Sequence, residues 1–198
     1  LESFQKFEDH VGDWRRWQLL NVGYVLARRD LEGPALEKVH EEGKVKVYRV
    51  ADPLPRAWVV HNAVQIPDDQ ALAYLNDDKF DPLVTGVLPP DDALVLGSGD
   101  ASGGSAAVLD ARPGIMVLEG SSPDDGLVVV SQPYHDGWDA TVDGKPVSIH
   151  RVDYLLQGIG VSSGEHRVEL RYHLPLWPVI VSLLAAAIGL VVVIFIRR

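Results

Sequence analysis

The sequence predicts a mainly β protein, with a β-sandwich-like domain, a few short helices and one C-terminal transmembrane helix. Three observations lead to this fold class: an amphipathic pattern opens the chain, six short apolar runs occupy residues 115–172, and an uncharged apolar run covers 174–196. Short strands divided by turn residues are typical of antiparallel sandwiches. The last run, at about 1.5 Å per residue, reaches across the roughly 30 Å hydrocarbon core of a bilayer.

Large apolar residues recur every three to four positions in residues 1–20, which predicts one amphipathic helix. Phe7, Val11 and Trp14 mark its apolar face, and acidic side chains occupy the opposite face. Because that polar face lacks the basic residues that anionic lipid attracts, we expect the helix to pack on the domain or on a partner helix rather than in a membrane interface.

Residues 21–96 predict a mixed α/β segment. Strands are expected over 22–27, 45–50 and 58–63, and helices over 35–42 and 68–75. Asp68 is a suitable N-cap for the second helix.

The segment 97–105 has four glycines and three serines, and it predicts a flexible loop. Residues 106–173 predict the β-sandwich, with strands over 115–118, 127–132, 138–142, 147–152, 154–161 and 166–172. Asp143-Gly144 predicts a two-residue hairpin turn, because this dipeptide tolerates the positive φ that both turn positions require.

The run 174–196 predicts the transmembrane helix, with Trp177 near its entry. A buried core helix is the alternative, and it would need a much larger protein around it. Ala185, Ala186 and Gly189 form a small-residue face on which a neighbouring helix can pack. The expected partners are therefore the lipid bilayer and a membrane-helix protein.

Composition and the terminal residues restrict location and partners. The chain carries 28 acidic and 18 basic residues, a formal net charge of −10, so nucleic acid is not an expected partner and neither is an anionic lipid surface. Arg197 and Arg198 on one flank of the run are matched by Arg167 and Arg171 on the other, so the positive-inside rule scarcely discriminates between orientations. We expect Arg197 and Arg198 inside, with a cytoplasmic C-terminus and an extracytoplasmic domain on the cell membrane. A cytosolic domain with a tail anchor is the rival topology. Since no signal-peptide pattern opens the chain, we expect either a cleaved leader or the C-terminal piece of a longer protein.

No catalytic residue, metal site or cofactor is predicted. Adjacent acidic pairs, such as Asp91-Asp92 and Asp124-Asp125, fit solvated turns better than a hydrolase site, whose two carboxyls face each other across a cleft. The seven histidines lack zinc-ligand spacing, and the sequence has no cysteine. Serines in 97–105 lack the strand–turn–helix setting of a nucleophile.

Tyr134, His135, Asp136 and Trp138 are the predicted binding residues, with a glycan or a lipid-linked sugar as ligand. Aromatic faces stack on sugars, and a turn at the end of a sandwich is exposed. For Trp138 a core role is favoured, because it begins a strand whose next inward positions are Ala140 and Val142. For Tyr134 binding and packing are equally compatible with the pattern.

Several phrases of this sequence resemble the C-terminal end of the bacterial YfhO-like membrane proteins. They are SQPYHDGW at 131–138, ATVDGKP at 140–146, Gly158 and SGEHRVELRY at 163–172, followed by the apolar run. Shorter similarity precedes them at 19–26, 55–60 and 80–82. The resemblance implies a polytopic parent with a glycosyltransferase-C type architecture, which moves a sugar from a lipid-linked donor to an extracytoplasmic acceptor.

The resemblance also implies that the catalytic acidic residues of such transferases lie in loops between early membrane helices. No position of this chain matches those loops, so the chain alone is not expected to be an enzyme. Two hypotheses follow. The chain is a non-catalytic, membrane-anchored extracytoplasmic module of a YfhO-like transferase that contacts the glycan acceptor, or it is a free-standing single-pass accessory subunit of a larger membrane protein complex.

Overall fold

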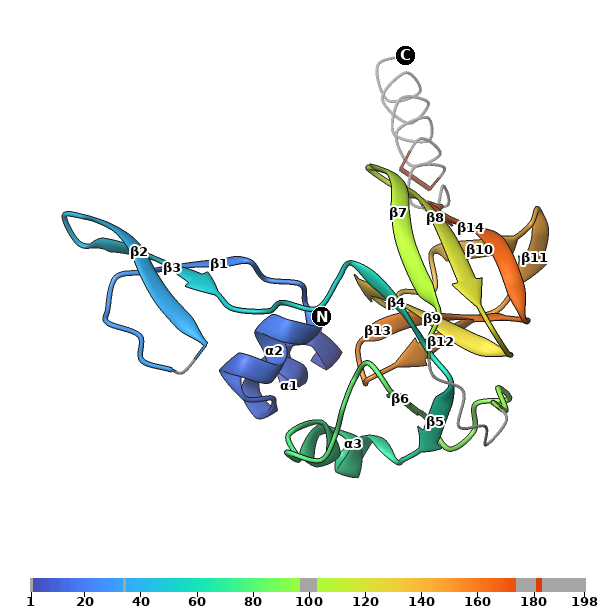
Figure 1. Cartoon of the computed structure of the whole chain (residues 1–198), viewed down its shortest axis with the longest axis horizontal. Coiled ribbons are helices and arrows are strands. Elements are labelled where there is room, and N and C mark those ends of the chain that lie inside the picture. Colours follow the sequence, from blue (N-terminus) through green and yellow to red (C-terminus); the bar gives the residue numbers. More distant parts are fainter. Residues whose placement is uncertain (1, 34, 97–102, 174–180, 183–198) are drawn as a thin grey trace, which may run out of the picture.

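The computed structural model describes residues 2–33, 35–96, 103–173 and 181–182. A sandwich of two antiparallel sheets forms the body of the molecule, and a separate three-stranded sheet projects from one side (Figure 1). The expected mainly β fold with a few short helices is confirmed. The sandwich joins a five-stranded sheet, ordered β11-β10-β14-β8-β7, to a four-stranded sheet, ordered β12-β13-β9-β4.

The elements of the body have the following bounds. The five-stranded sheet contains β7 (Ser105–Arg112), β8 (Ile115–Ser122), β10 (Trp138–Val142), β11 (Lys145–Val147) and β14 (Gly164–Tyr172). The four-stranded sheet contains β4 (Ala57–Val60), β9 (Gly126–Pro133), β12 (Ile149–Val152) and β13 (Leu156–Val161). A parallel pair, β5 (Asn62–Gln65) and β6 (Thr85–Leu88), lies with the helices α1 (Glu2–His10), α2 (Asp13–Leu19) and α3 (Asp68–Leu75).

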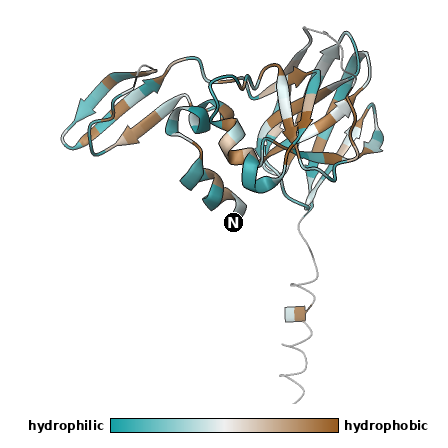
Figure 2. Cartoon of the chain, turned by 90° about the horizontal axis from the view of Figure 1, so that it is seen from below, coloured by the Kyte–Doolittle hydropathy of each residue, from teal (hydrophilic) through white to brown (hydrophobic). Residues whose placement is uncertain are grey.

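The four-stranded sheet is buried on both faces. Val128 and Val130 of β9 face the five-stranded sheet in one apolar cluster, which also contains Leu118 and Leu170. Leu127 and Val129 point the other way into a second cluster, which the helices close. Successive side chains of a strand point to opposite faces, so a strand buried on both sides reads as a continuous apolar run. Figure 2 shows such apolar residues gathered along the strands of the body.

The prediction of one helix over residues 1–20 is wrong, because the structure has two. Asn76 explains the break: its Oδ1 accepts a hydrogen bond from the Gly12 amide at 2.8 Å, and its Nδ2 donates one to the carbonyl of His10 at 2.8 Å. One side chain thus satisfies backbone groups at the end of α1 and the start of α2. Phe7 and Leu19 are fully buried against the sheet, so the expectation that this segment packs on the domain is confirmed.

The helix predicted over 35–42 is also wrong, because this segment is strand β2 (Leu36–Glu42). It pairs with β3 (Val45–Val50), which pairs in turn with β1 (Tyr24–Ala27), and Gly43 turns the chain with φ +59°. Leu, Glu and Lys favour a helix in isolation, but pairing across the tight turn overrides that weak preference. The strand predicted over 58–63 divides between β4 and β5, which belong to different sheets.

The Asp143-Gly144 turn is confirmed. Its two residues have φ +52° and +76°, and Val142 pairs directly with Lys145. The Asp143 carboxylate accepts a hydrogen bond from the Arg167 amide at 2.9 Å and lies 2.7 Å from Nδ1 of His166. These two contacts hold the pKa of Asp143 below its usual value. The turn is therefore also fastened to β14.

Two expectations fall on residues that the structure does not describe. The predicted transmembrane helix over 174–196 lies outside the described residues, except for the helical positions 181–182, and so does its small-residue face at Ala185, Ala186 and Gly189. Only residues 103–105 of the predicted loop 97–105 are described. Within the described ranges, no helix is both long enough and apolar enough to cross a membrane.

Gly158 lies where β13 passes closest to its neighbours. A Cβ at this position would lie 2.3 Å from Cγ2 of Val152 and 2.9 Å from Cδ1 of Leu127. Both contacts are far shorter than van der Waals distance, and the neighbours belong to a closely packed cluster that cannot move aside freely. The sheet therefore requires glycine here.

We predict that Gly158→Ala lowers the free energy of unfolding by about 3 kcal/mol through overpacking. Thermal or denaturant unfolding of the full chain in detergent measures the change. Gly23→Ala is the matched control, since a Cβ there meets nothing within 4 Å. Adding Val152→Ala to Gly158→Ala should recover part of the loss. Equal stabilities of the two single variants would contradict the packing explanation.

Candidate functional site

The turn that carries the predicted binding residues lies at one end of the sandwich, beside two other turns. Pro133 pairs with Leu156, Trp138 with Tyr172, and Arg171 with Ile115, so the β7–β8, β9–β10 and β12–β13 turns all lie beside the last residues of β14. We call this region the β14 end. The described part of the body stops here at residue 173.

Backbone hydrogen bonds fix the β9–β10 turn in place. The Tyr134 amide donates to the carbonyl of Leu155 at 2.7 Å, and the His173 amide donates to the carbonyl of Gly137 at 2.7 Å. A Cβ on Gly137 would lie only 2.6 Å from Cε2 of Tyr172, so the backbone touches that ring. The turn is held to both sheets and to the end of β14.

Trp138 closes the edge of the core between the sheets. Its ring packs against Tyr172 with centroids 5.3 Å apart, and His135 packs against the same ring at 5.6 Å. Trp138 lies against the apolar cluster that contains Ala140 and Leu170. Its position supports the packing role that the sequence favours for it.

Tyr134 does not share an aromatic surface with Trp138. Its half-buried side chain lies near Asp136, Arg151 and Asp92. Burial raises the pKa of the Tyr134 hydroxyl, and the negative charge of Asp136 adds to that shift. His135 and Asp136 are exposed. The structure thus brings Tyr134 and Asp136 together, whereas His135 lies with the half-buried Trp138 against the ring of Tyr172.

A polar network next to Tyr134 could not be read from the sequence. Nδ1 of His150 lies 2.8 Å from Oδ1 of Asp92, and the two side chains are 15% and 11% exposed. Arg151 donates to Oδ1 of Asp68 at 2.7 Å and to the carbonyl of Tyr154 at 3.1 Å. Asp92 is therefore not the solvated turn residue that its Asp-Asp context predicts. Its partner, His150, is 58 positions away in the sequence, and a local sequence pattern cannot predict a contact over that separation.

A shallow groove of about 420 Å³ lies on the outer surface of the five-stranded sheet. It is lined by charged and polar side chains that include Asp139, Glu169, Arg171 and His173, with Pro146 and Val147 as apolar floor. Its ions are paired with one another, Arg171 with Glu169 at 3.2 Å and His173 with Asp139 at 3.1 Å. The groove offers donors and acceptors to a polar ligand, but no predicted binding residue lines it.

Asp153 is a buried carboxyl that binds strand β6. Its Oδ1 accepts a hydrogen bond from the Val87 amide at 2.9 Å, and its own amide donates to the carbonyl of Val87 at 2.8 Å. The side chain is fully buried, and Oδ2 has no hydrogen-bond partner among the described residues. Burial raises the pKa of Asp153 to about 7, although the nearby positive charge of Arg15 opposes the shift. Near neutral pH this carboxyl holds a proton in part of the molecules.

Within the described ranges, no three His, Cys, Asp or Glu side chains lie close enough together to hold a metal ion. The donors and acceptors of the β14 end are suited to hydrogen-bonding a hydroxyl-rich ligand. Asp136 and His135 supply the exposed groups, and Tyr134 supplies the adjacent aromatic ring.

Comparison with known proteins finds a family to which this end of the chain is similar. Residues 118–183 match the family described as bacterial membrane protein YfhO. Over this stretch the chain is similar to the YfhO proteins. The match begins within β8, includes the Tyr134, Asp153 and Gly158 positions, and continues beyond the end of β14.

The YfhO protein of Bacillus subtilis (strain 168) is 32% identical over 76 residues, which are 37% of this chain and 8% of that relative. The chain thus spans only a small part of the length of that relative. No solved structure matches the chain. Since YfhO is a family of bacterial membrane proteins, the comparison supports association of this YfhO-like chain with a membrane.

We predict that Asp153 makes stability depend on pH between about 4 and 7. Unfolding releases a proton in this range, because the folded pKa of about 7 exceeds the ordinary value of 3.8. The free energy of unfolding therefore falls as pH rises through the window and levels off above it, by up to about 4 kcal/mol in total.

Unfolding of the full chain at a series of pH values measures this slope. Asp153→Asn keeps the acceptor for the Val87 amide but cannot ionise, so the slope between pH 5 and 7 should flatten. Asp124→Asn, at an exposed turn, is the control and should leave the slope unchanged. An unaltered slope in Asp153→Asn would show that this carboxyl does not titrate in the window.

Proposed function

We propose that this chain is the non-catalytic extracytoplasmic module of a YfhO-like glycosyltransferase that uses a lipid-linked sugar. A single helix over 174–196 would hold it on the cell membrane, with the C-terminus in the cytoplasm. The family match, which runs unbroken from β8 past the end of β14 and into this predicted helix, is the observation that carries the proposal.

The position of the β14 end supports a role beside the membrane. β14 ends at Tyr172, and the predicted helix begins at residue 174. So short a connection cannot act as a flexible tether, which supports a position of the β14 end next to the lipid headgroups in the proposed arrangement. A lipid-linked sugar or a growing glycan would meet this end of the sandwich first.

The chemistry of the β14 end supports binding rather than catalysis. Asp92 is paired with His150, and Asp68 with Arg151, so these groups already have partners. Asp136, next to Tyr134 and His135, is exposed and can accept hydrogen bonds from sugar hydroxyls. The reaction itself would be carried by membrane loops elsewhere in the parent protein.

The alternative role, a free-standing accessory subunit of a membrane complex, predicts a different gene organisation. Further hydrophobic spans encoded in frame upstream of residue 1 support the transferase module. A start codon or a cleaved leader immediately upstream supports the subunit instead.

We predict that residues on the two sides of the helix proposed over 174–196 react on opposite sides of the membrane. The chain has no cysteine, so single cysteines can be placed freely. Glu165→Cys, at the exposed start of β14, should be labelled by an impermeant maleimide in intact cells. A cysteine added after Arg198 should react only after permeabilisation. The reverse pattern would indicate a cytosolic domain and contradict the proposal.

We predict that the full chain in detergent binds its glycan ligand on an array through the Tyr134 turn. Asp136→Asn should weaken binding about tenfold, because it removes a charged hydrogen-bond acceptor. Tyr134→Ala removes the ring and should also weaken binding. Asp124→Asn, on the turn at the opposite end of the sandwich, is the matched control. Unchanged affinity in folded Asp136→Asn and Tyr134→Ala would eliminate this site.

A further inference from the structure

The three-stranded sheet β1-β3-β2 projects from the body, and its two faces differ (Figure 1). On one face Tyr48 and Val50 are buried. The Tyr48 hydroxyl accepts a hydrogen bond from the Leu31 amide at 3.1 Å, so the loop after β1 covers this side. This face is accounted for within the chain.

The opposite face carries large apolar side chains that nothing in the described chain covers. Tyr24 is 61% exposed, Leu26 is 70% exposed and Val45 is 39% exposed. Leu26 pairs with Val47, so these residues of β1 and β3 lie on one side of the sheet. We call this surface the Leu26 face. Figure 2 shows apolar residues on the projecting sheet as well as in the body.

Unpaired basic residues surround the far edge of the Leu26 face. Arg28 and Arg29 follow β1 directly, and Lys44 lies in the adjacent β2–β3 turn; all three are exposed. None of them has a carboxylate partner among the described residues. This edge of the sheet therefore presents free positive charge.

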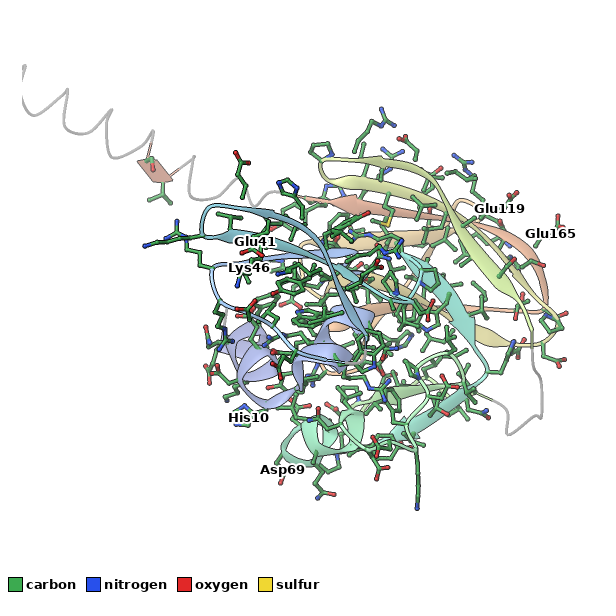
Figure 3. All side chains as sticks on the ribbon, turned by 60° about the vertical axis from the view of Figure 1, so that its left-hand side comes forward. His10, Glu41, Lys46, Asp69, Glu119 and Glu165 are labelled. Atoms are coloured by element: carbon green, nitrogen blue, oxygen red, sulfur yellow. The ribbon has the colours of Figure 1, made fainter. Side chains whose placement is uncertain are left out.

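Asp30, Glu37 and Glu41 each have a Lys or Arg partner. Glu42 is exposed, and its partner among the described residues is His40, at 3.9 Å. Lys46 pairs with Asp30, and Lys38 lies 2.6 Å from Glu41. Glu41 and Lys46 come from facing strands, β2 and β3, as Figure 3 shows. The chain as a whole has a net charge of −10, but charges farther away than the ~8 Å Debye length at physiological salt are largely screened. Composition alone therefore gives the wrong sign for this edge.

We propose that the Leu26 face docks onto an anionic lipid bilayer. Tyr and Leu side chains suit the boundary between headgroups and acyl chains, and flanking Arg and Lys residues suit the headgroup phosphates. Two copies that paired through this same face would bring their exposed Arg28, Arg29 and Lys44 side chains together, so the positive charge favours lipid over a second copy. Together with the helix proposed over 174–196, the sheet provides a second membrane contact, which fixes the orientation of the sandwich on the lipid surface. This orientation rests on the proposed anchor.

The test uses the full chain, reconstituted in nanodiscs of phosphatidylcholine alone or with one quarter phosphatidylglycerol. Leu26→Cys carries an environment-sensitive fluorophore, and Leu109→Cys, 54% exposed on β7, carries the same label as the control. We expect a blue-shifted emission at residue 26 that lipid-borne quenchers suppress in the anionic nanodiscs. The label at residue 109 should stay in water in both.

Removing positive charge from the edge of the Leu26 face tests the electrostatic contribution to docking. Arg28→Gln with Arg29→Gln should lower the docked population at residue 26 about 30-fold, whereas Lys79→Gln with Lys145→Gln, at exposed sites elsewhere, should not change it. A water-exposed label at residue 26 in anionic nanodiscs would overturn docking. A blue shift at residue 26 that lipid-borne quenchers fail to suppress would also overturn it, because protein would then cover the face.

Alkaline extraction of vesicles containing the same labelled chains separates this inference from the proposed function. A chain that resists extraction while residue 26 stays in water retains its anchor and contradicts docking alone. A chain that is extracted, yet has residue 26 quenched by lipid before extraction, contradicts the anchor and supports docking.

Discussion

The double-sided burial of the four-stranded sheet is the constraint on which the rest of the structure depends. Strand β9 lies inside this sheet, between β13 and β4, and its valines contribute to both apolar clusters. One cluster joins the sheet to its partner in the sandwich, and the other binds α1, α2, α3 and the β5–β6 pair. Because both clusters share the same strands, a change that displaces β9 or β13 disturbs both sides. The requirement for glycine at position 158 follows from this arrangement.

The same sheet determines where chemistry can occur. β9 leads directly into the turn that carries Tyr134 and Asp136, and β12 carries His150 and Arg151 to the same end. Asp153, in the turn between β12 and β13, accepts the amide of Val87 and so binds the outer parallel pair to the sheet. The β14 end is thus a rigid collection of turns. A ligand that binds there would meet a surface whose shape is already set by the core.

The sequence predicts some elements of the fold and misses others, because some have a local sequence signal and others depend on contacts between distant residues. The sequence predicts strand β10 and the Asp143-Gly144 turn with their observed bounds, because each has a strong local signal. Helix α3 also ends at the expected Leu75, but the prediction of Asp68 as its N-cap is wrong: Pro67 is the N-cap, and the Asp68 carboxylate pairs with Arg151. Strand β2 was predicted as a helix, since its composition favours one and its partner β3 lies beyond a turn. The break between α1 and α2 depends on Asn76, more than 60 positions away. The Asp92–His150 pair has the same character, because only the fold brings the two residues together.

The structure gives a packing or backbone reason for several residues in the segments that resemble the YfhO proteins. Gly137 touches the ring of Tyr172, Gly158 leaves room for Val152, Asp143 shapes a turn, and Trp138 fills the edge of the core. Each of these residues is required by packing or backbone geometry, without any ligand. The likeness to YfhO proteins is therefore evidence for a shared fold at this end of the chain, and it carries no information about binding at Tyr134. Binding has to be judged from the groups that packing leaves free. At the β14 end these include the exposed carboxylate of Asp136, and on the projecting sheet they are the apolar and basic side chains of the Leu26 face.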